Sequence, residues 1–138
     1  MHSKGSYAAY IASNFNFDNN RASLVKIEDG KYSQVLLKEE GIVSYGVTYD
    51  PISGRIYSLD ENEDFSLKLV STFAFDDEET SVPISPSNVV LDCLTSGPAG
   101  IYSLDTTGRI GKINTETGKW TALLNEPLPA PYASFVAA

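Results

Sequence analysis

Alternating oxygen-bearing side chains near the middle of the chain are the first candidates for chemistry. Asp60, Asn62 and Asp64 have the spacing that places alternate oxygens around Ca²⁺, which takes several oxygen ligands at short range. Phe65 stands where that motif needs Gly, and Ser71 stands where it needs the closing Glu. Calcium binding is therefore one hypothesis. The alternative is a solvated hairpin tip, since Asn and Asp are ordinary turn residues.

A second alternation of the same kind lies near the beginning of the chain, at Asn14, Asn16, Asp18 and Asn20. It falls in the connection that corresponds to residues 60–64 in the first of the repeat units described below. The same two interpretations, a calcium loop or a polar turn, apply to it.

Aromatic side chains form the other candidate site. The chain has eight Tyr, six Phe and one Trp, and we expect most of them to pack in the interior, where large rings bury well. Trp120 and Tyr32 stand at equivalent places in two related hairpins. Aromatic residues on such outer strands stack sugars in small repeat lectins, so these two are the ligand-binding candidates. A repeated packing role explains the equivalence as well.

Several kinds of catalytic site are excluded by residue counts. His2 is the only His, so no Ser-His-Asp set has a positioned base, and one Cys with one His cannot form a zinc cluster. No Gly-rich nucleotide loop is present. Cys93 lies in an apolar run and is expected to be a small buried thiol. The 18 acidic residues leave a paired-carboxylate hydrolase open, but no spacing singles out a pair.

The net charge of −8 argues against partners that are themselves negatively charged. Nucleic acids and anionic membranes are bound through clustered Lys and Arg, so we expect neither. Residues 1–6 have no apolar core of a signal peptide, and we expect a disordered leader or an expression remnant there. The compartment stays open, with a location outside the cytoplasm favoured.

The candidate residues for calcium and ligand binding lie within a sequence repeat, which must position them. The pentapeptide Ile-Tyr-Ser-Leu-Asp occurs at residues 56–60 and again at residues 101–105, and a period in the forties is typical of β-propeller blades. Short β-branched and aromatic runs separated by Gly, Pro, Asn and Asp predict strands. The strands expected are 45–49, 55–59, 65–70, 71–75 (a fourth strand or its approach), 88–94, 101–104, 109–113 and 119–124, with turns at 50–54, 95–100 and 114–118.

An all-β propeller of about three four-stranded blades follows from this pattern. The first blade lacks its first strand, and residues 10–13 best fit its second. The blade boundaries expected are 7–40, 41–86 and 87–128, followed by a closing strand in 129–138.

The closing strand suggests how the ring is completed. Residues 132–137 match the first-strand segment 45–50, and three blades are too few for one ring. A second copy with C2 symmetry would complete a six-bladed ring. The alternative, which the sequence leaves equally open, is a piece of a longer propeller.

The sequence of residues 100–105 and 114–120 resembles that of the NHL-like, quinoprotein-like and gluconolactonase-like bacterial propellers. The resemblance covers about residues 41–124. The Trp-Asp dipeptide of WD repeats and the Gly-Gly pair of kelch blades are absent. The lactonase relatives imply a metal held on the ring axis by Glu, Asn and Asp, but no residues here match that site one by one.

The function favoured is a non-enzymatic binding module that presents an axial or inter-blade surface to a protein or a carbohydrate. A metal-dependent hydrolase of lactonase type is the alternative, and a structural fragment without a site of its own is the third interpretation. No cofactor is firmly implied beyond the calcium hypothesis.

Overall fold

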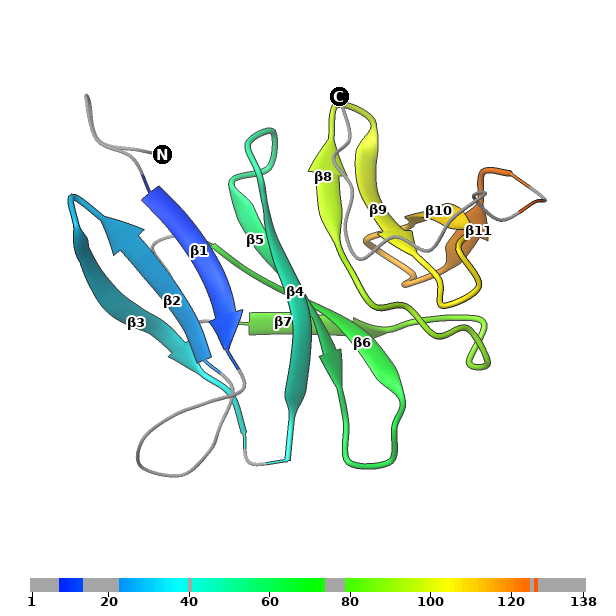
Figure 1. Cartoon of the computed structure of the whole chain (residues 1–138), viewed down its shortest axis with the longest axis horizontal. Coiled ribbons are helices and arrows are strands. Elements are labelled where there is room, and N and C mark those ends of the chain that lie inside the picture. The colour runs from blue at the N-terminus through cyan, green and yellow to red at the C-terminus, as the bar shows by residue number, and fades with distance from the viewer. Residues whose placement is uncertain (1–7, 14–22, 40, 74–78, 125, 127–138) are drawn as a thin grey trace.

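The computed structural model describes residues 8–13, 23–39, 41–73, 79–124 and 126, and every regular element in these ranges is a β-strand. The strands form three antiparallel sheets that follow one another along the chain and lie in a row (Figure 1). The all-β prediction is confirmed. Within the same ranges, no helix is long and apolar enough to cross a bilayer.

The first sheet has three strands in the order β1 (Ala8–Ser13), β2 (Ser23–Glu28) and β3 (Lys31–Leu37). Asp29 and Gly30 join β2 to β3, with φ values of 53° and 73°. An Asp-Gly pair with positive φ at both positions is the favoured two-residue hairpin turn, since its twist matches that of the strands. The turn therefore sets the register of this hairpin.

The second sheet is a meander of β4 (Val43–Asp50), β5 (Arg55–Glu61), β6 (Leu67–Phe73) and β7 (Glu79–Pro83). The predicted strands 45–49 and 55–59 are confirmed. Residues 71–73 belong to β6, so they lead toward the fourth strand, which is β7. Pro83 ends β7 at the edge of the sheet, where a missing amide hydrogen costs no ladder bond.

The third sheet consists of β8 (Thr95–Gly97), β9 (Gly100–Leu104), β10 (Ile110–Ile113) and β11 (Trp120–Ala122). β10 and β11 fall within predicted strands, and β9 contains the predicted strand 101–104 and begins one residue before it. The first strand is a correction, because residues 88–94 form no strand and β8 lies inside the predicted turn 95–100.

The reason for this correction is local pairing. Gly97 pairs with Gly100, so a two-residue loop is enough to join β8 to β9. In the preceding segment Leu91 and Cys93 are buried in alternation, like strand residues, yet only Leu91 forms a bridge, to Asp105. The apolar alternation that predicted a strand reflects burial without a backbone ladder.

The repeated pentapeptide supplies the central core. Ile56, Leu59, Ile101 and Leu104 are each at most 2% exposed. The cluster of buried residues runs across the second and third sheets without a break, so these two sheets share one interior: Tyr57, Leu59, Leu67, Leu69, Ile84, Leu91, Ile101, Ile113 and Trp120. Burying residues of this kind is the main favourable term in holding two sheets together.

The first strands of the sheets lie next to one another. β4 in the middle sheet lies beside β1 of the first sheet and β8 of the third. The two four-stranded antiparallel sheets agree with the predicted blade architecture, whereas ring closure and the blade boundaries stay predictions. Residues 1–6 and 129–138, for which a leader and a closing strand were predicted, lie outside the described residues.

Candidate functional site

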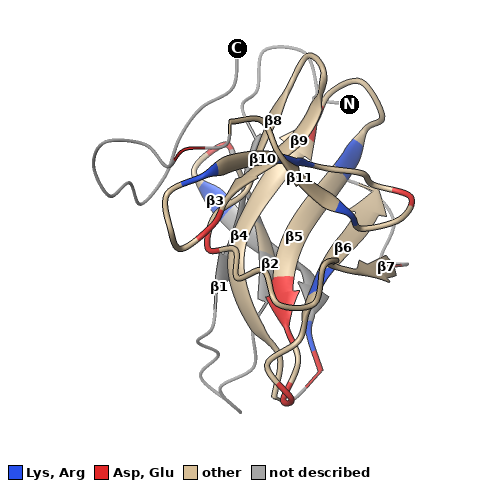
Figure 2. Ribbon diagram, turned by 90° about the vertical axis from the view of Figure 1, so that its right-hand side faces the viewer, with Lys and Arg blue, Asp and Glu red and all other residues tan. Residues whose placement is uncertain are grey.

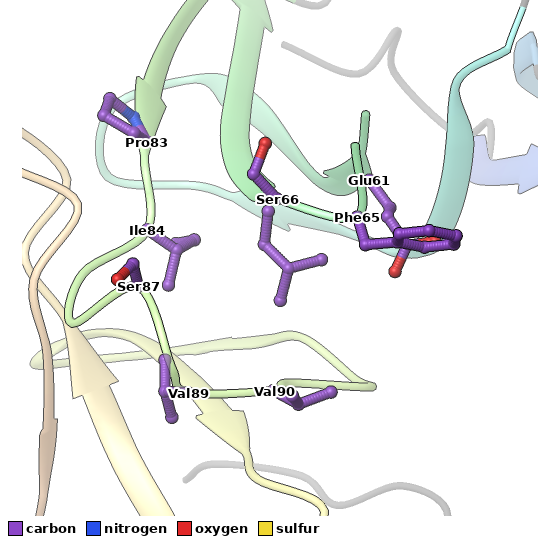
Figure 3. A pocket seen from close by; sticks show the side chains of 9 residues that line it. Glu61, Phe65, Ser66, Pro83, Ile84, Ser87, Val89 and Val90 are labelled. Atoms are coloured by element: carbon purple, nitrogen blue, oxygen red, sulfur yellow. The ribbon is translucent and has the colours of Figure 1, made fainter. Parts of the chain in front are cut away.

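A pocket of about 260 Å³ lies between the second sheet and the connection that leads to the third (Figure 3). Its lining comes from the end of β5, the β5–β6 hairpin, the start of β6, the end of β7 and the connection 84–90. The lining residues are mostly apolar, with one carboxylate and two hydroxyls: Glu61, Phe65, Ser66, Leu67, Pro83, Ile84, Ser87, Val89 and Val90. Concave apolar sites with a few polar groups are the usual form of a ligand pocket.

The floor and the rim of the pocket differ in exposure. Leu67 and Ile84 are buried and belong to the shared core. Phe65, beside Glu61 on the hairpin side, is 80% exposed, and Val90, on the connection, is 52% exposed (Figure 3). Exposed apolar side chains beside a concave surface are typical of interaction sites, in contrast to isolated exposed ones.

The hairpin that carries Phe65 is held by a compact set of hydrogen bonds. The amide of Asn62 donates to the carbonyl of Ser66 (2.9 Å), and the amide of Phe65 donates to the carbonyl of Asn62 (2.9 Å). The Ser66 hydroxyl donates to Asp64 Oδ1 (2.5 Å), which also accepts from the Ser66 amide (3.1 Å). These hydrogen bonds lower the pKa of Asp64.

The conformation of Phe65 itself is unusual. Its φ is 68°, in the left-handed region that bulky side chains rarely adopt. Such a conformation costs about 1–3 kcal/mol and persists where the surroundings impose it, which is often at binding sites. The ring is largely exposed, so the backbone hydrogen bonds of the turn, rather than side-chain packing, hold this conformation.

The opposite wall is fixed to both sheets. The amide of Ile84 donates to the carbonyl of Leu67 in the second sheet (2.9 Å). Ser85 is bonded to the third sheet on both sides, because its amide donates to the Gly118 carbonyl (3.0 Å) and its carbonyl accepts from the Trp120 amide (2.8 Å). The pocket is therefore preformed by backbone contacts in this part of the chain.

Acidic groups dominate the charge near the pocket. Glu61 ends β5 inside the lining, and acidic residues also occupy the adjacent hairpin (Figure 2). Partial burial, and then the Glu61 carboxylate, raise the pKa of Tyr45. A ligand group that is positively charged or donates hydrogen bonds would be favoured here.

A buried charged cluster surrounds Asp60, the calcium candidate that lies in β5. Lys38 Nζ is 2.9 Å from Asp60 Oδ2 and donates to Ser58 Oγ (3.1 Å), and both charged side chains are almost fully buried. Ser44 Oγ donates to Asp60 Oδ1 (2.6 Å). From the described residues Oδ2 accepts no well-directed hydrogen bond, so its contact with Lys38 is chiefly electrostatic. Glu79 adds a second, partly exposed carboxylate 3.4 Å from Nζ.

Asp105, the equivalent residue directly after β9, makes different contacts. Asp105 accepts hydrogen bonds from the amides of Thr107 (3.0 Å) and Arg109 (2.8 Å) and pairs with the Arg109 guanidinium (3.0 Å). Burial alone would raise the pKa of Asp105, but these bonds outweigh it and the pKa is lowered. The repeated Asp is thus an anchor between segments in one sheet and a turn cap in the other.

The calcium candidates are engaged in these two separate arrangements. Asp60 faces Lys38 and Ser44, whereas Asn62 and Asp64 bond to Ser66 in the hairpin. Within the described residues, no group of three or more His, Cys, Asp or Glu side chains could hold a metal ion. Asn14, Asn16, Asp18 and Asn20 lie outside those residues. Calcium binding stays a prediction.

The two aromatic candidates have different outcomes. Trp120 is 6% exposed, belongs to the core cluster and donates its indole N–H to the Ser103 carbonyl (3.2 Å). Its ring fills the space over Gly111, where an added Cβ would lie 2.1 Å from the indole. These contacts are the ones expected if Trp120 has a packing role and does not bind a ligand. Tyr32 lies in β3 opposite Ile27, and its side chain is outside the described part.

Sequence reasoning missed Lys38, Phe65 as a pocket residue, and the wall 84–90. The only signal for Lys38 was indirect, because a buried Asp at the end of an apolar strand requires a charged partner. Cys93 is buried and unpaired as predicted, and burial raises the pKa of its thiol. Its backbone carbonyl accepts a hydrogen bond from the Ser103 hydroxyl.

No protein family model, curated protein or solved structure matches this chain. The resemblance to bacterial propellers therefore stays a prediction, and a functional interpretation depends on the geometry of the chain itself.

Proposed function

We propose that this chain is a non-enzymatic recognition module of propeller type, which binds a protein segment in the pocket between its second sheet and the connection that leads to the third. The segment would insert an apolar side chain between Phe65 and Val90 and place a basic residue near Glu61. The observation that carries the proposal is an exposed, strained Phe65 at the rim of a preformed apolar pocket.

The propeller part of the proposal is supported by the sheet order. Each of the three sheets is an antiparallel meander, and their first strands lie side by side. In a propeller, successive four-stranded meanders of this kind are arranged around a central channel. The pocket described above lies where the second meander ends and the chain continues toward the third.

A protein ligand is favoured over a carbohydrate by the lining. Sugars need several convergent hydrogen-bonding groups besides a stacking ring, whereas this pocket offers one carboxylate and two hydroxyls among six apolar residues. The net charge of −8 further favours a segment with basic residues, through faster association.

The test is a random peptide display selection against the whole chain, followed by affinity measurements on enriched peptides. We expect peptides with an apolar residue next to Lys or Arg, and a loss of about 30-fold in affinity with Phe65→Asn, the effect of removing a central aromatic contact. Asn tolerates the left-handed conformation, so this variant should keep its thermal stability. Val90→Asn should weaken binding in the same direction.

Ile52→Asn is the matched control, because Ile52 is an exposed apolar residue (75%) on the β4–β5 turn and is not part of the pocket. Peptides that bind all variants equally, or no enrichment at all, would contradict the proposal. Glycan-array hits that disappear with Phe65→Asn, without any peptide binder, would assign the pocket to carbohydrate instead.

A further inference from the structure

The edge of β1 that faces away from β2 is the feature that points beyond the pocket. β1 pairs with β2 on one side, and within the described ranges no strand pairs with its other side. The second and third sheets have β4 and β8 at the corresponding position. An unpaired strand edge exposes a row of backbone donors and acceptors that readily pairs with another strand.

The registers of the sheets show that the position is equivalent. Tyr10 pairs with Lys26 as Tyr102 pairs with Lys112. In the next hairpin, Ile27 pairs with Tyr32 as Ile113 pairs with Trp120. Strands β1, β2 and β3 therefore correspond, residue for residue at these points, to β9, β10 and β11.

The complete sheets define what should lie beside β1. Thr95 of β8 faces Tyr102, and Thr48 of β4 faces Tyr57. By the same register, the partner of β1 should place the residue equivalent to Thr48 opposite Tyr10.

One segment of the chain has the pattern of such a partner. Residues 132–137 (Tyr-Ala-Ser-Phe-Val-Ala) align with residues 45–50 (Tyr-Gly-Val-Thr-Tyr-Asp), the greater part of β4. They begin ten residues after the end of β11 (132 − 122 = 10), a spacing close to the twelve residues from the end of β7 to the start of β8 (95 − 83 = 12). The segment thus stands where the first strand of a further sheet is expected.

We propose that residues 132–137 of a second copy of this chain pair with the free edge of β1, and that the exchange is reciprocal. Phe135 of the second copy would face Tyr10, and its Val136 would face Ala9. The two copies form a C2 dimer in which six sheets close one ring, a number within the range of closed propellers. Closure leaves neither copy with the β1 edge exposed.

The first experiment is the molar mass of the whole chain by light scattering. We expect about twice the chain mass of 15.0 kDa. A monomer at micromolar concentration overturns the proposal.

The second experiment tests the register with disulfides between different chains. Paired residues of adjacent strands have Cα atoms about 4.5–5.5 Å apart, within the range that a disulfide bridges. A mixture of Ala9→Cys chains with Val136→Cys chains, unfolded together, refolded and oxidised, should give a covalent dimer. Neither variant alone should do so, because native Cys93 is buried and its burial-raised pKa keeps the thiol unreactive.

A mixture of Ala9→Cys chains with Ala133→Cys chains is the control for register. In the proposed pairing Val136 faces Ala9, and Ala133 lies three residues away from Val136 along the strand. Equal cross-linking in the control contradicts the register, and no cross-linking in either mixture contradicts the pairing. A disulfide within one chain of the double variant Ala9→Cys, Val136→Cys would show that the segment closes on its own chain, which overturns the dimer.

Discussion

Lys38 and Asp60 show how a single buried pair joins two parts of the chain. Lys38 comes after the first sheet, and Asp60 belongs to the second, yet both side chains are at most 3% exposed. Removing water from two charges is costly, and their attraction with added hydrogen bonds must compensate. The pair therefore gives specificity to the way the segment after β3 attaches to β5.

Lys38→Met should lower the free energy of unfolding by about 3–5 kcal/mol, because it leaves the Asp60 carboxylate buried without its cation. Urea denaturation measures the change. The double variant Lys38→Met, Asp60→Leu should recover most of the loss, since two apolar side chains need no compensation. Lys68→Met, at a partly exposed position of the otherwise largely buried β6, is the control and should change stability by less than about 0.5 kcal/mol.

Asp105 makes stability depend on acidic pH. Because the pKa of the folded carboxyl is lowered from its ordinary value of 3.8, the unfolded chain takes up this proton first. The stabilisation is complete above 3.8 and is lost as the pH falls through the lower folded pKa. Asp105→Asn should therefore be less stable than the unchanged protein at neutral pH. Between about pH 5 and about pH 3 its free energy of unfolding should fall by less than that of the unchanged protein. Parallel curves for the two proteins would contradict this assignment.

Turn glycines with similar backbone conformations have different surroundings in the second and third sheets. Gly118, in the β10–β11 turn, has a φ of 78°, and a Cβ there would lie 1.9 Å from the Pro83 carbonyl oxygen. Gly54, in the β4–β5 turn, has a φ of 73° with nothing within 4 Å. Gly118 thus marks the close contact between the second and third sheets that supports one wall of the pocket.

Gly118→Ala should cost about 2–4 kcal/mol of unfolding free energy, from the left-handed backbone together with the clash. Gly54→Ala, with the backbone effect alone, should cost about 1 kcal/mol. Thermal or urea unfolding of both variants gives the difference. Equal losses would mean that the contact with Pro83 does not constrain the sheets.

At the scale of the whole molecule, the proposed strand exchange ties stability to concentration. A dimer that unfolds to two chains is stabilised by mass action, so a tenfold increase in concentration should raise the Tm by about 2–4 °C. The disulfide-linked dimer of Ala9→Cys and Val136→Cys chains should lack this dependence. A Tm that is independent of concentration for the unlinked protein would oppose the exchange.

The sequence alone determined the strands that carry the repeat. Residues 56–60 lie in β5, residues 101–104 lie in β9 with Asp105 directly after it, and the turns at 50–54 and 114–118 are where Gly and Asn predicted them. These features depend on alternating burial and on backbone preferences of turn residues, which act over a few neighbours. The equivalence of the β2–β3 and β10–β11 hairpins is of the same local kind.

Only the tertiary structure decided which of these residues meet. The alternation in residues 88–94 could not reveal that β8 lies further on, because pairing with β9 selects the strand. No local pattern paired Lys38 with Asp60, buried Trp120 over Gly111, or brought Phe65 and Val90 to the same pocket. Contacts between sheets depend on side chains that are distant in sequence, so identical pentapeptides end in an ion pair at Asp60 and in a turn cap at Asp105.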